Sequence, residues 1–384
     1  MKYCVLGAGM MGSAAAYDLA TVDPANEVLL CDLDLATAQN AARSIGPGVR
    51  PCQLDVRNRA DLLAALNGVS AVISAVSYAV NYPVSRIAIE AGVHMCDMGG
   101  NNDVVDQQIT LAAEAQRRGV LIVPNCGLAP GLINTLAMHG YSQFDAVDSI
   151  ALRVGGLPQH PRPPLNYAIV FSVEGLINEY LEPATVIRKG VLHSVESLDD
   201  LEELEFPAPF NRLEAFNTSG GLSLLPRLLE GKVRNLDYKT IRYPGHCEKF
   251  RTLLELGFAS SEPVIVGGTV RTAREIFTEL LRKKLGYADK DVVLARASIT
   301  GHRQGRQERL VYELIDYYDE TTRMTAMMRT TAFPTAITAR LIATGVVAAR
   351  GVLAPEQCVP GDRMIQELAR RNITITEHLT TPDH

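Results

Sequence analysis

A glycine-rich turn near the N-terminus constrains the fold of this chain more than any other feature. Glycines at positions Gly7, Gly9 and Gly12 follow the apolar run 5–6, and Asp32 closes a second apolar run twenty residues after the last of them. In such a motif the first glycine allows a tight turn, the second lets the backbone approach a pyrophosphate, and the third lets the next helix pack close to the strand. The motif and its context predict a dinucleotide-binding βαβ unit whose helix N-terminus faces the phosphates.

Asp32 indicates which dinucleotide binds. A carboxylate at this position accepts hydrogen bonds from the ribose hydroxyls of the adenosine and repels a 2′-phosphate, so we expect NAD rather than NADP. Other ligand contacts are expected at the carboxyl ends of the strands. Beyond the glycines and Asp32, the predicted cofactor contacts are Met10, Met11, Asp55, Ala75, Val76 and Asp97. A glycine turn that serves packing alone is the alternative interpretation.

The composition is typical of a folded protein with a small-molecule ligand. The 384 residues suffice for roughly two domains, and 47% apolar against 21% charged residues predict a packed core. The net charge is −6 without any basic block, which argues against a nucleic-acid or anionic-membrane partner. No apolar run approaches the ~20 residues of a membrane-spanning helix, and Met1 leads directly into a strand pattern. We therefore expect a cytoplasmic protein.

Neither disulfides nor a metal site are expected. The seven cysteines are scattered, odd in number and without a CxxC pair, which is typical of reduced thiols. The eight histidines lack HxxxH or HExxH spacing, and no carboxylate run resembles a calcium loop. A GxSxG elbow and a Walker lysine are absent as well, so hydride transfer with NAD is the default chemistry.

Residues 1–130 are predicted to form an NAD-binding α/β domain with a Rossmann, doubly wound parallel sheet, because short β-rich runs alternate with helical patterns. Two mononucleotide-binding halves need six strands. The six β-rich runs are 3–6, 27–31, 49–54, 71–75, 93–97 and 120–124. Helical spacing occurs over 61–66, 80–91 and 104–118, and the glycines just beyond these segments, Gly68, Gly92 and Gly119, are plausible helix stops.

A second, α+β domain for substrate binding and dimerisation is expected over residues 131–330. Its strand-like stretches are 149–154, 167–171, 185–188, 292–299 and 309–317, and a helical pattern covers 273–285. The charged stretch 199–205 is most simply a solvated loop or helix face. Residues 331–384 are again mainly helical, with a short strand at 373–376, and we expect this tail to pack back on the Rossmann domain or to bridge both domains.

Two segments of the second domain carry candidate catalytic residues. Tyr167 lies on a loop constrained by glycines and prolines, where its hydroxyl could reach a substrate; a tyrosine packed for structural reasons is the alternative. The segment 239–246 is the densest polar cluster. Arg242 suits bidentate capture of a carboxylate, and His246 could accept or relay a proton near neutral pH. An ordinary ion pair and a satisfied core histidine are the alternatives for these two residues.

Longer motifs resemble those of a known family across nearly the whole chain. They are 127–134 (GLAPGLIN), 154–158 (VGGLP), 163–167 (PPLNY), 213–216 (LEAF), 218–221 (TSGG), 239–246 (KTIRYPGH) and 329–332 (RTTA). The chain resembles the saccharopine dehydrogenase-like proteins, and among them the L-lysine 6-dehydrogenases. The resemblance implies NAD-dependent oxidative deamination of the lysine ε-amine to the 6-semialdehyde, which cyclises onto its α-amine, and a homodimer or larger homo-oligomer.

The resemblance also suggests roles for single residues. The implied step needs a deprotonated ε-amine, C6 near the nicotinamide and an anchored α-carboxylate. Arg242 is the candidate anchor, and Tyr167 and His246 are the candidates for proton transfer. Asp97 could hold an ammonium near the nicotinamide, with a helix N-cap as the alternative. Glu214, in a matched segment, could recognise the α-ammonium.

Three other functions stay open on the sequence alone. A saccharopine dehydrogenase would share the fold, the cofactor and Arg242, but its substrate has three carboxylates and needs more cationic groups, which Lys239, Arg153, Arg162 and Arg188 could supply. A non-catalytic NAD-binding regulator would keep the fold without needing a polar substrate pocket. A dehydrogenase for another diamine or amino acid, such as ornithine or a carboxyalkyl polyamine, would differ in the length of its pocket.

Overall fold

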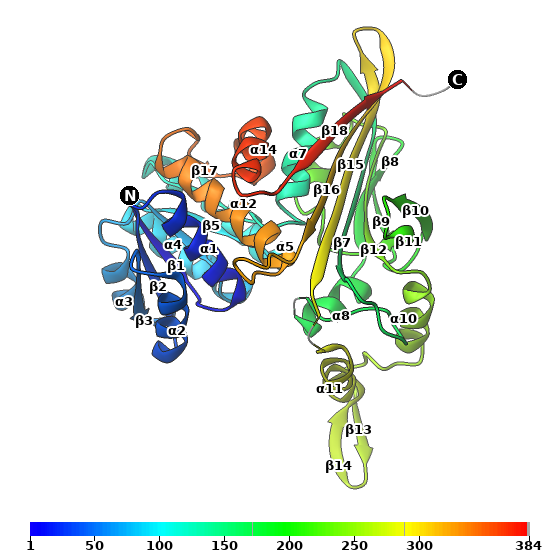
Figure 1. The fold of residues 1–384 in the computed structure, drawn as a ribbon, viewed down its shortest axis with the longest axis horizontal. Coiled ribbons are helices and arrows are strands. Elements are labelled where there is room, and N and C mark those ends of the chain that lie inside the picture. The colour runs from blue at the N-terminus through cyan, green and yellow to red at the C-terminus, as the bar shows by residue number, and fades with distance from the viewer. Residues whose placement is uncertain (171, 288, 382–384) are drawn as a thin grey trace. The chain divides into compact units, whose positions relative to one another are not determined.

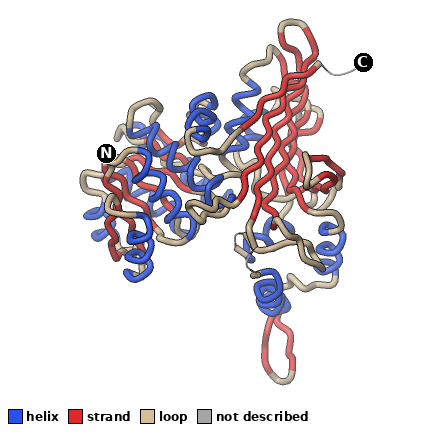
Figure 2. Tube along the Cα trace, viewed as in Figure 1, coloured by secondary structure: helices blue, strands red, loops and turns tan. Residues whose placement is uncertain are grey.

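The computed structural model describes residues 1–170, 172–287 and 289–381. Contacts along the chain divide it into two compact units. The first unit comprises Met1–Gln143 and Met328–Ile375, and the second comprises Phe144–Met327 and residues 376–384. Figure 2 distinguishes the helices, strands and loops of both units.

The first unit contains a seven-stranded parallel sheet (Figure 1). Its strand order is β17-β6-β5-β4-β1-β2-β3. The strands are β1 (Lys2–Leu6), β2 (Glu27–Asp32), β3 (Val49–Gln53), β4 (Ala71–Ser74), β5 (His94–Asp97), β6 (Leu121–Val123) and β17 (Gly351–Val352). The predicted doubly wound sheet is confirmed, and its six predicted strands end within one residue of their expected positions. Only the edge strand β17, from the C-terminal part of the chain, was not expected.

Helices connect the strands of this sheet, and polar side chains cap several of them. The helices are α1 (Met10–Val22), α2 (Leu35–Ile45), α3 (Arg59–Ala65), α4 (Asn81–Ala91), α5 (Asn102–Ile109) and α6 (Ala112–Arg117). Asp34, Asn58 and Asn101 accept hydrogen bonds from the first backbone N–H groups of α2, α3 and α5, which stabilises these helix ends. Gly92 ends α4 in the left-handed conformation, as the sequence predicted. The single helix predicted over 104–118 is instead divided into α5 and α6.

Four further helices complete the first unit. They are α7 (Leu132–Tyr141), most of α12 (Ala326–Ala343), α13 (Pro355–Cys358) and α14 (Gly361–Ala369). Arg371, just after α14, forms ion pairs with Asp18 of α1 and with Glu367, and Arg340 of α12 also pairs with Glu367. Asp18, Glu367 and Arg371 are buried at these contacts, so the pairs fasten the C-terminal segment to the first helix of the chain.

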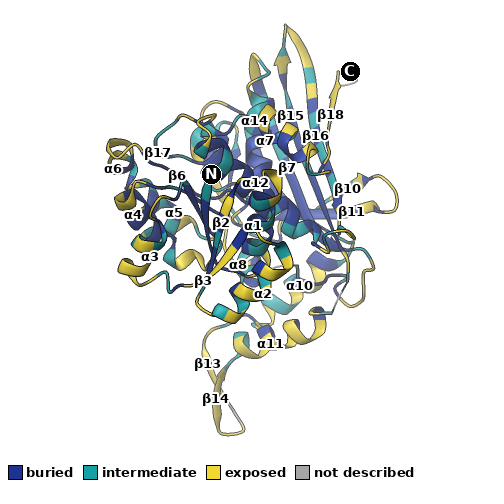
Figure 3. Cartoon of the chain, turned by 60° about the vertical axis from the view of Figure 1, so that its left-hand side comes forward, coloured by how far each residue is buried: buried dark blue, intermediate teal, exposed yellow. Residues whose placement is uncertain are grey.

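The second unit is built on a nine-stranded mixed sheet, in which β7 and β12 are the parallel neighbours. The main order is β10-β11-β12-β7-β15-β16-β18, with β8 paired to β12 and to β9. The strands are β7 (Ala146–Pro158), β8 (Ala184–Arg188), β9 (Val191–Val195), β10 (Glu202–Phe206), β11 (Asn211–Asn217), β12 (Asn235–Arg242), β15 (Asp291–Arg303), β16 (Arg306–Tyr317) and β18 (Ile375–Thr380). Strands β7 and β15 are buried along most of their length (Figure 3).

Apolar side chains from both the sheet and the helices form the core of the second unit. The helices are α8 (Val173–Leu181), α9 (Leu225–Leu229), α10 (His246–Glu255) and α11 (Ala273–Leu285), and a hairpin of β13 (Pro263–Val266) and β14 (Thr269–Thr272) precedes α11. One core cluster contains Tyr180 of α8, Phe216 of β11, Phe250 of α10 and Phe277 of α11. These aromatic rings surround the polar residues described below.

Two predictions for the second unit are wrong. Residues 167–170 form a loop rather than a strand, because Tyr167 is packed into the core cluster of α8 and α10; position 171 lies outside the described residues. The stretch 199–205 is not simply a solvated loop or helix face, since Glu202–Phe206 forms β10 and pairs with β11. The carboxylate of Glu202 lies between two basic side chains of the sheet, which explains its position there. Within the described part of the chain, no helix has the length and apolarity needed to cross a membrane.

Candidate functional site

The glycine-rich turn has the geometry that its sequence predicts. Gly7 adopts a φ of +95°, and a Cβ atom there would lie 2.6 Å from the carbonyl oxygen of Ala75. A Cβ atom on Gly12 would clash with the carbonyl oxygen of Gly7. Among the described residues, nothing lies within 4 Å of a Cβ placed on Gly9, the residue that precedes α1. The turn therefore leaves space for a ligand at the N-terminus of α1, where the helix dipole favours an anion.

Asp32 is fixed beside this turn. Its carboxylate accepts hydrogen bonds from the backbone N–H groups of Ala8 at 2.8 Å and Asp34 at 3.0 Å. The side chain is thus oriented at the carboxyl end of β2, next to the glycine turn, where a ribose contact is expected. Met10 is 58% exposed at the start of α1. Asp55 follows β3 and forms a hydrogen-bonded ion pair with Arg57 at 2.8 Å.

The remaining predicted cofactor residues lie at the same edge of the sheet. Ala75 and Val76 follow β4 and both approach Gly7, while Met11 is partly exposed in α1. Asp97, at the end of β5, is completely buried. These positions agree with a ligand site at the carboxyl ends of parallel strands.

Asp97 holds the loops at this edge together. Its carboxylate accepts hydrogen bonds from the backbone N–H groups of Gly99 at 2.8 Å and Asn125 at 3.1 Å and from the amide of Gln108 at 2.8 Å. Burial raises the pKa of Asp97, although these three donors favour the charged form. The N-cap of α5 is Asn101, so Asp97 is not the helix cap that was considered for it. Its direct contacts tie the segment after β5 to the segment after β6.

Four of the five predicted catalytic residues lie in the second unit and form one polar cluster around Arg242. Arg242, at the end of β12, is 3% exposed as a residue. Its Nε donates to the hydroxyl of Tyr180 at 2.9 Å, and its Nη1 donates to the carbonyl oxygen of Ile241 at 2.9 Å. The guanidinium carbon also lies 4.7 Å from the ring centroid of Tyr167, within the range of a cation–π interaction. Arg242 is therefore held in one orientation from three sides.

His246 is a buried, neutral partner of the same cluster. Its Nδ1 lies 2.9 Å from the carbonyl oxygen of Leu165, and its Nε2 lies 3.1 Å from the hydroxyl of Tyr180. Since a carbonyl only accepts, Nδ1 carries the proton and Nε2 accepts from Tyr180. Burial and the nearby positive charge of Arg242 lower the pKa of His246 to about 3. Both ring nitrogens are thus engaged, as in a satisfied core histidine.

Tyr167 and Glu214 complete the group of predicted residues. Tyr167 is 1% exposed, and burial raises the pKa of its hydroxyl to about 12. Glu214 lies opposite Arg242 in the β11–β12 register. Its two carboxylate oxygens accept hydrogen bonds from the backbone N–H groups of Gly245 and Cys247, each at 2.7 Å. Glu214 therefore fixes the turn between β12 and α10, which determines where Arg242 and His246 stand.

Sequence reasoning missed two residues of this cluster, Glu179 and Tyr180. Both lie near the end of α8, and Tyr180 links Arg242 to His246. Burial raises the pKa of Glu179 to about 7, although the charge of Arg242 acts in the opposite direction. Residues 173–181 read as an ordinary amphipathic helix. No local signal separates a functional glutamate or tyrosine in such a helix from a structural one.

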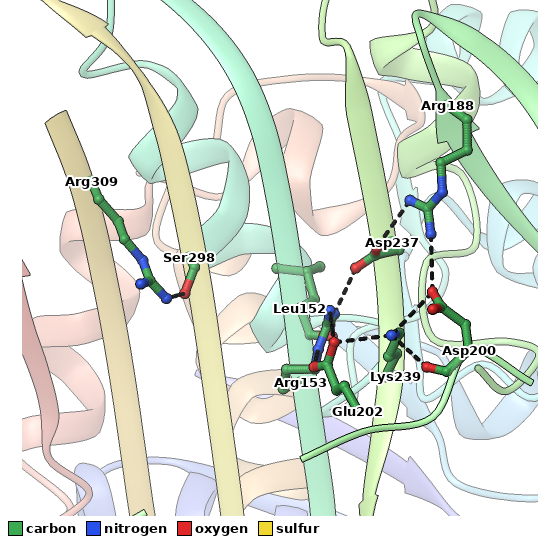
Figure 4. A network of polar contacts seen from close by, with 9 residues as sticks. All are labelled: Leu152, Arg153, Arg188, Asp200, Glu202, Asp237, Lys239, Ser298 and Arg309. Atoms are coloured by element: carbon green, nitrogen blue, oxygen red, sulfur yellow. Dashed lines mark hydrogen bonds and ion pairs between the residues drawn. The ribbon is translucent and has the colours of Figure 1, made fainter. Parts of the chain in front are cut away.

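A separate ion-pair network engages three of the four cations that could have served additional substrate carboxylates (Figure 4). Arg153 pairs with Glu202 and with Asp237, the latter at 2.6 Å, and Lys239 pairs with Glu202 at 2.9 Å. Arg188 pairs with Asp237 at 2.9 Å. The fourth cation, Arg162, lies over the ring of Tyr287. These side chains already have partners, in contrast to the open edge of Arg242 described below.

The described residues contain no group of three or more His, Cys, Asp or Glu side chains that could hold a metal ion. The seven cysteines are free thiols, and the sulfur atoms of Cys4 and Cys31 lie 3.8 Å apart. The functional candidates are therefore the turn with Asp32 in the first unit and the Arg242 cluster in the second unit.

Two family models together match nearly all of the chain. Residues 3–123 match the saccharopine dehydrogenase NADP binding domain, and residues 127–373 match the saccharopine dehydrogenase C-terminal domain. Mouse mitochondrial alpha-aminoadipic semialdehyde synthase is 24% identical over 427 residues, which cover 92% of this chain and 45% of that protein. The saccharopine dehydrogenase (NADP(+), L-glutamate-forming) of Schizosaccharomyces pombe is 23% identical over 220 residues, covering 55% and 48%. The chain spans about half the length of these curated relatives.

Solved structures support the same fold. The structure of saccharopine dehydrogenase (L-Glu forming) from Saccharomyces cerevisiae has a TM-score of 0.81 at 19% identity and covers 99% of this chain and 100% of its own. A homospermidine synthase from Legionella pneumophila, solved with NAD, has a TM-score of 0.68 at 11% identity and covers 99% and 91%. Because the two family matches span nearly all of the sequence, the chain belongs to the saccharopine dehydrogenase family.

Proposed function

We propose that this chain is an NAD-dependent oxidoreductase that deaminates the ε-amine of L-lysine. The observation that carries the proposal is the state of the buried cations in the second unit. Arg242 has an unused edge, whereas Arg153, Lys239 and Arg188 are paired with carboxylates of the protein. One open guanidinium suits a substrate with one carboxylate, and lysine is such a substrate.

The reaction is balanced by simple steps. Bound NAD would supply the hydride acceptor, and loss of hydride from C6 of the neutral ε-amine gives an iminium ion. Water adds to the iminium carbon and ammonium leaves, which yields 2-aminoadipate 6-semialdehyde. The aldehyde then condenses with the α-amine, with loss of water, to piperideine-6-carboxylate. In this proposal Arg242 anchors the α-carboxylate, so that C6 is held at a fixed distance from the anchor.

The neighbours of Arg242 take positioning roles in this proposal. His246 and Glu214 have all their acceptor and donor atoms engaged by the protein, so we assign them to orienting Tyr180 and the turn before α10. Tyr167 covers the guanidinium, and with a pKa of about 12 its hydroxyl stays protonated at the pH of the reaction. The ε-amine therefore loses its proton to solvent, and kcat/KM is expected to rise with pH toward the ordinary lysine pKa of about 10.4.

The glycine turn and Asp32 are the proposed cofactor site. The family domain is named for NADP, but the acid at the end of β2 favours NAD because a 2′-phosphate would meet a fixed carboxylate. Met10, Met11, Ala75 and Val76 are the proposed contacts beside the glycines. We assign Asp97 to holding the strand-end loops, since its oxygens already accept three hydrogen bonds.

Saccharopine dehydrogenase activity is the second candidate. It is supported by the family membership and by the agreement in fold with the yeast enzyme. Saccharopine has three carboxylates, and its binding would require cations beyond Arg242 to leave their present partners. Homo-oligomerisation and a cytoplasmic location are further predictions, which light scattering and fractionation would test.

The test is NADH formation by the purified protein with L-lysine at alkaline pH, beside saccharopine, ornithine and NADP. Lysine-dependent NADH formation, with little NADPH formation, is the expected result. The Arg242→Lys variant should raise KM for lysine on the order of 100-fold, because it loses the planar guanidinium. Arg309→Lys, on an exposed position of the same sheet, is the matched control. Activity with saccharopine alone would assign the second function, and no turnover of any amine would leave a non-catalytic NAD-binding regulator.

A further inference from the structure

We propose that Glu179 and Arg242 together form a binding site for the zwitterionic head group of an α-amino acid. In this site the substrate carboxylate binds the open edge of Arg242, and the α-ammonium binds the carboxylate of Glu179. For the identity of the substrate, this inference rests on the proposed function. It adds a residue, Glu179, that selects α-amino acids over simple amines.

The first half of the argument concerns the unused edge of Arg242. Nε and Nη1 have protein acceptors at 2.9 Å each, whereas Nη2 has no hydrogen-bond partner among the residues that the structure describes. Nη2 is not fully buried, so it keeps contact with solvent. A guanidinium that is oriented by the protein and open at one edge can donate hydrogen bonds to a carboxylate.

The second half concerns Glu179, which precedes Tyr180 on α8. The backbone of Glu179 is fixed, since its carbonyl oxygen accepts a hydrogen bond from the N–H of Ser219 at 3.0 Å. Its side-chain carboxylate has neither a hydrogen bond nor an ion pair with any described residue, yet it is only partly exposed. A carboxylate withdrawn from water without a partner is costly, so a cationic ligand at this point would be stabilising.

The two groups belong to one site. Glu179 and Arg242 lie close enough for the positive charge of Arg242 to lower the pKa of the Glu179 carboxyl, against the effect of burial. Tyr180 follows Glu179 in the sequence and hydrogen bonds to Arg242, which joins α8 directly to the end of β12. The carboxylate of Glu179 and the open edge of Arg242 thus carry opposite charges on two elements, α8 and β12, that Tyr180 joins.

Glu214, the residue predicted from sequence to bind the α-ammonium, serves instead to fix the turn before α10. Both of its oxygens are engaged by the backbone N–H groups of Gly245 and Cys247 at 2.7 Å. The neighbouring acids of the ion-pair network, Glu202 and Asp237, are paired with arginine or lysine. Around Arg242, Glu179 is therefore the carboxylate among the described residues that remains open to a ligand.

The proposal is tested by calorimetric binding of three probes, measured with the NAD-loaded protein. L-Norleucine carries both head groups, hexanoate carries only the carboxylate, and pentylamine carries only the ammonium. The expected result is that norleucine binds more tightly than either of the others. Glu179→Gln should weaken norleucine binding by roughly 10- to 100-fold, the range for a charge-assisted hydrogen bond, and leave hexanoate binding unchanged.

Two further variants keep the result interpretable. Arg242→Lys should weaken both norleucine and hexanoate, and Glu255→Gln, at an exposed position of α10, should change neither. Equal losses for norleucine and hexanoate in Glu179→Gln would assign a structural role to Glu179 and overturn the proposal, as would unchanged norleucine binding. If norleucine binding depends on Glu179 but the protein turns over no amine, the head-group site is supported and the proposed reaction is rejected.

Discussion

The hydroxyl oxygen of Tyr180 lies 2.9 Å from Nε of Arg242, and this contact joins helix α8 to the end of strand β12. The same hydroxyl donates its proton to Nε2 of His246, whose Nδ1 in turn donates to the carbonyl of Leu165. Three segments distant in sequence therefore determine how the guanidinium is oriented. The orientation of the Arg242 guanidinium depends on this chain of hydrogen bonds.

Tyr180→Phe tests the chain directly. The variant leaves Nε of Arg242 and Nε2 of His246 without their partner, so the free energy of unfolding should fall by about 1–3 kcal/mol. KM for the amino-acid substrate should rise as well, because the guanidinium loses its fixed orientation. Urea denaturation and initial rates measure the two effects. Tyr243→Phe is the control: it also loses a hydrogen bond, a partly buried one to the carbonyl of Pro158 at 2.9 Å, and should reduce stability without raising KM.

Glu214→Gln tests the turn between β12 and α10. An amide accepts with only one of its two terminal atoms, so either Gly245 or Cys247 loses its acceptor. The free energy of unfolding should fall by about 1–3 kcal/mol, since one buried N–H is left unpaired. The exposed acid Glu203, replaced in Glu203→Gln, serves as the comparison. If Glu214→Gln unfolds like the wild type in urea, Glu214 does not hold this turn.

Asp32→Ser tests the cofactor preference. Removing the carboxylate removes the hydrogen bonds to the ribose and the repulsion of a 2′-phosphate, so kcat/KM for NAD should fall and that for NADP should rise. We expect the ratio of kcat/KM for NAD to kcat/KM for NADP to fall by roughly 10- to 100-fold. The reason is that one charge-assisted hydrogen bond and one repulsion are lost together. Asp362→Asn, at an exposed position of α14, controls for a general effect of net charge. An unchanged ratio would show that another residue selects the cofactor.

His246 makes a specific contribution to the pH dependence of stability. Its pKa is about 3 in the folded protein and about 6.5 when unfolded, so the unfolded chain takes up a proton first as the pH falls. The stability from His246 is complete above pH ~6.5 and is lost progressively down to pH ~3, with about 2 kcal/mol lost at pH 5. His246→Asn lacks this titration. The difference in unfolding free energy between wild type and variant should shrink by that amount between pH 7.5 and 5.

Glu356 should show the opposite sign. It is 8% exposed in α13, and burial raises its pKa to about 7. The folded protein therefore holds a proton that the unfolded chain releases, and stability is lost as the pH rises from ~4.5 through ~7. Glu356→Gln removes this cost, so it should be more stable than wild type by about 3 kcal/mol at pH 8 and equally stable below pH ~4.5. Parallel stability curves for the two proteins would contradict a buried ionisable Glu356.

The elements that the sequence predicted well are those whose causes are local. The glycine spacing, the alternation of apolar runs and the helix-ending glycines predicted β1 to β6 and the turn before α1, because each depends on residues close together in the chain. The prediction of a strand at 167–170 was wrong because it also used only local residues. Its β-branched residues favour a strand locally, but Tyr167 is drawn into the aromatic core around Phe250.

The roles of the polar residues could not be read from local patterns. The residues alone predicted a glycine turn followed by an acid and a cationic segment 239–246. The folded structure was needed to show that Glu214 serves the turn before α10, that Lys239 is paired, and that the Glu179 carboxylate has no hydrogen-bond partner among the described residues. The physical reason is that a charged side chain is free or engaged according to partners brought to it by strand register and helix packing. Residues 179, 214 and 242 are distant in sequence, and no local pattern predicts that they lie in one part of the fold.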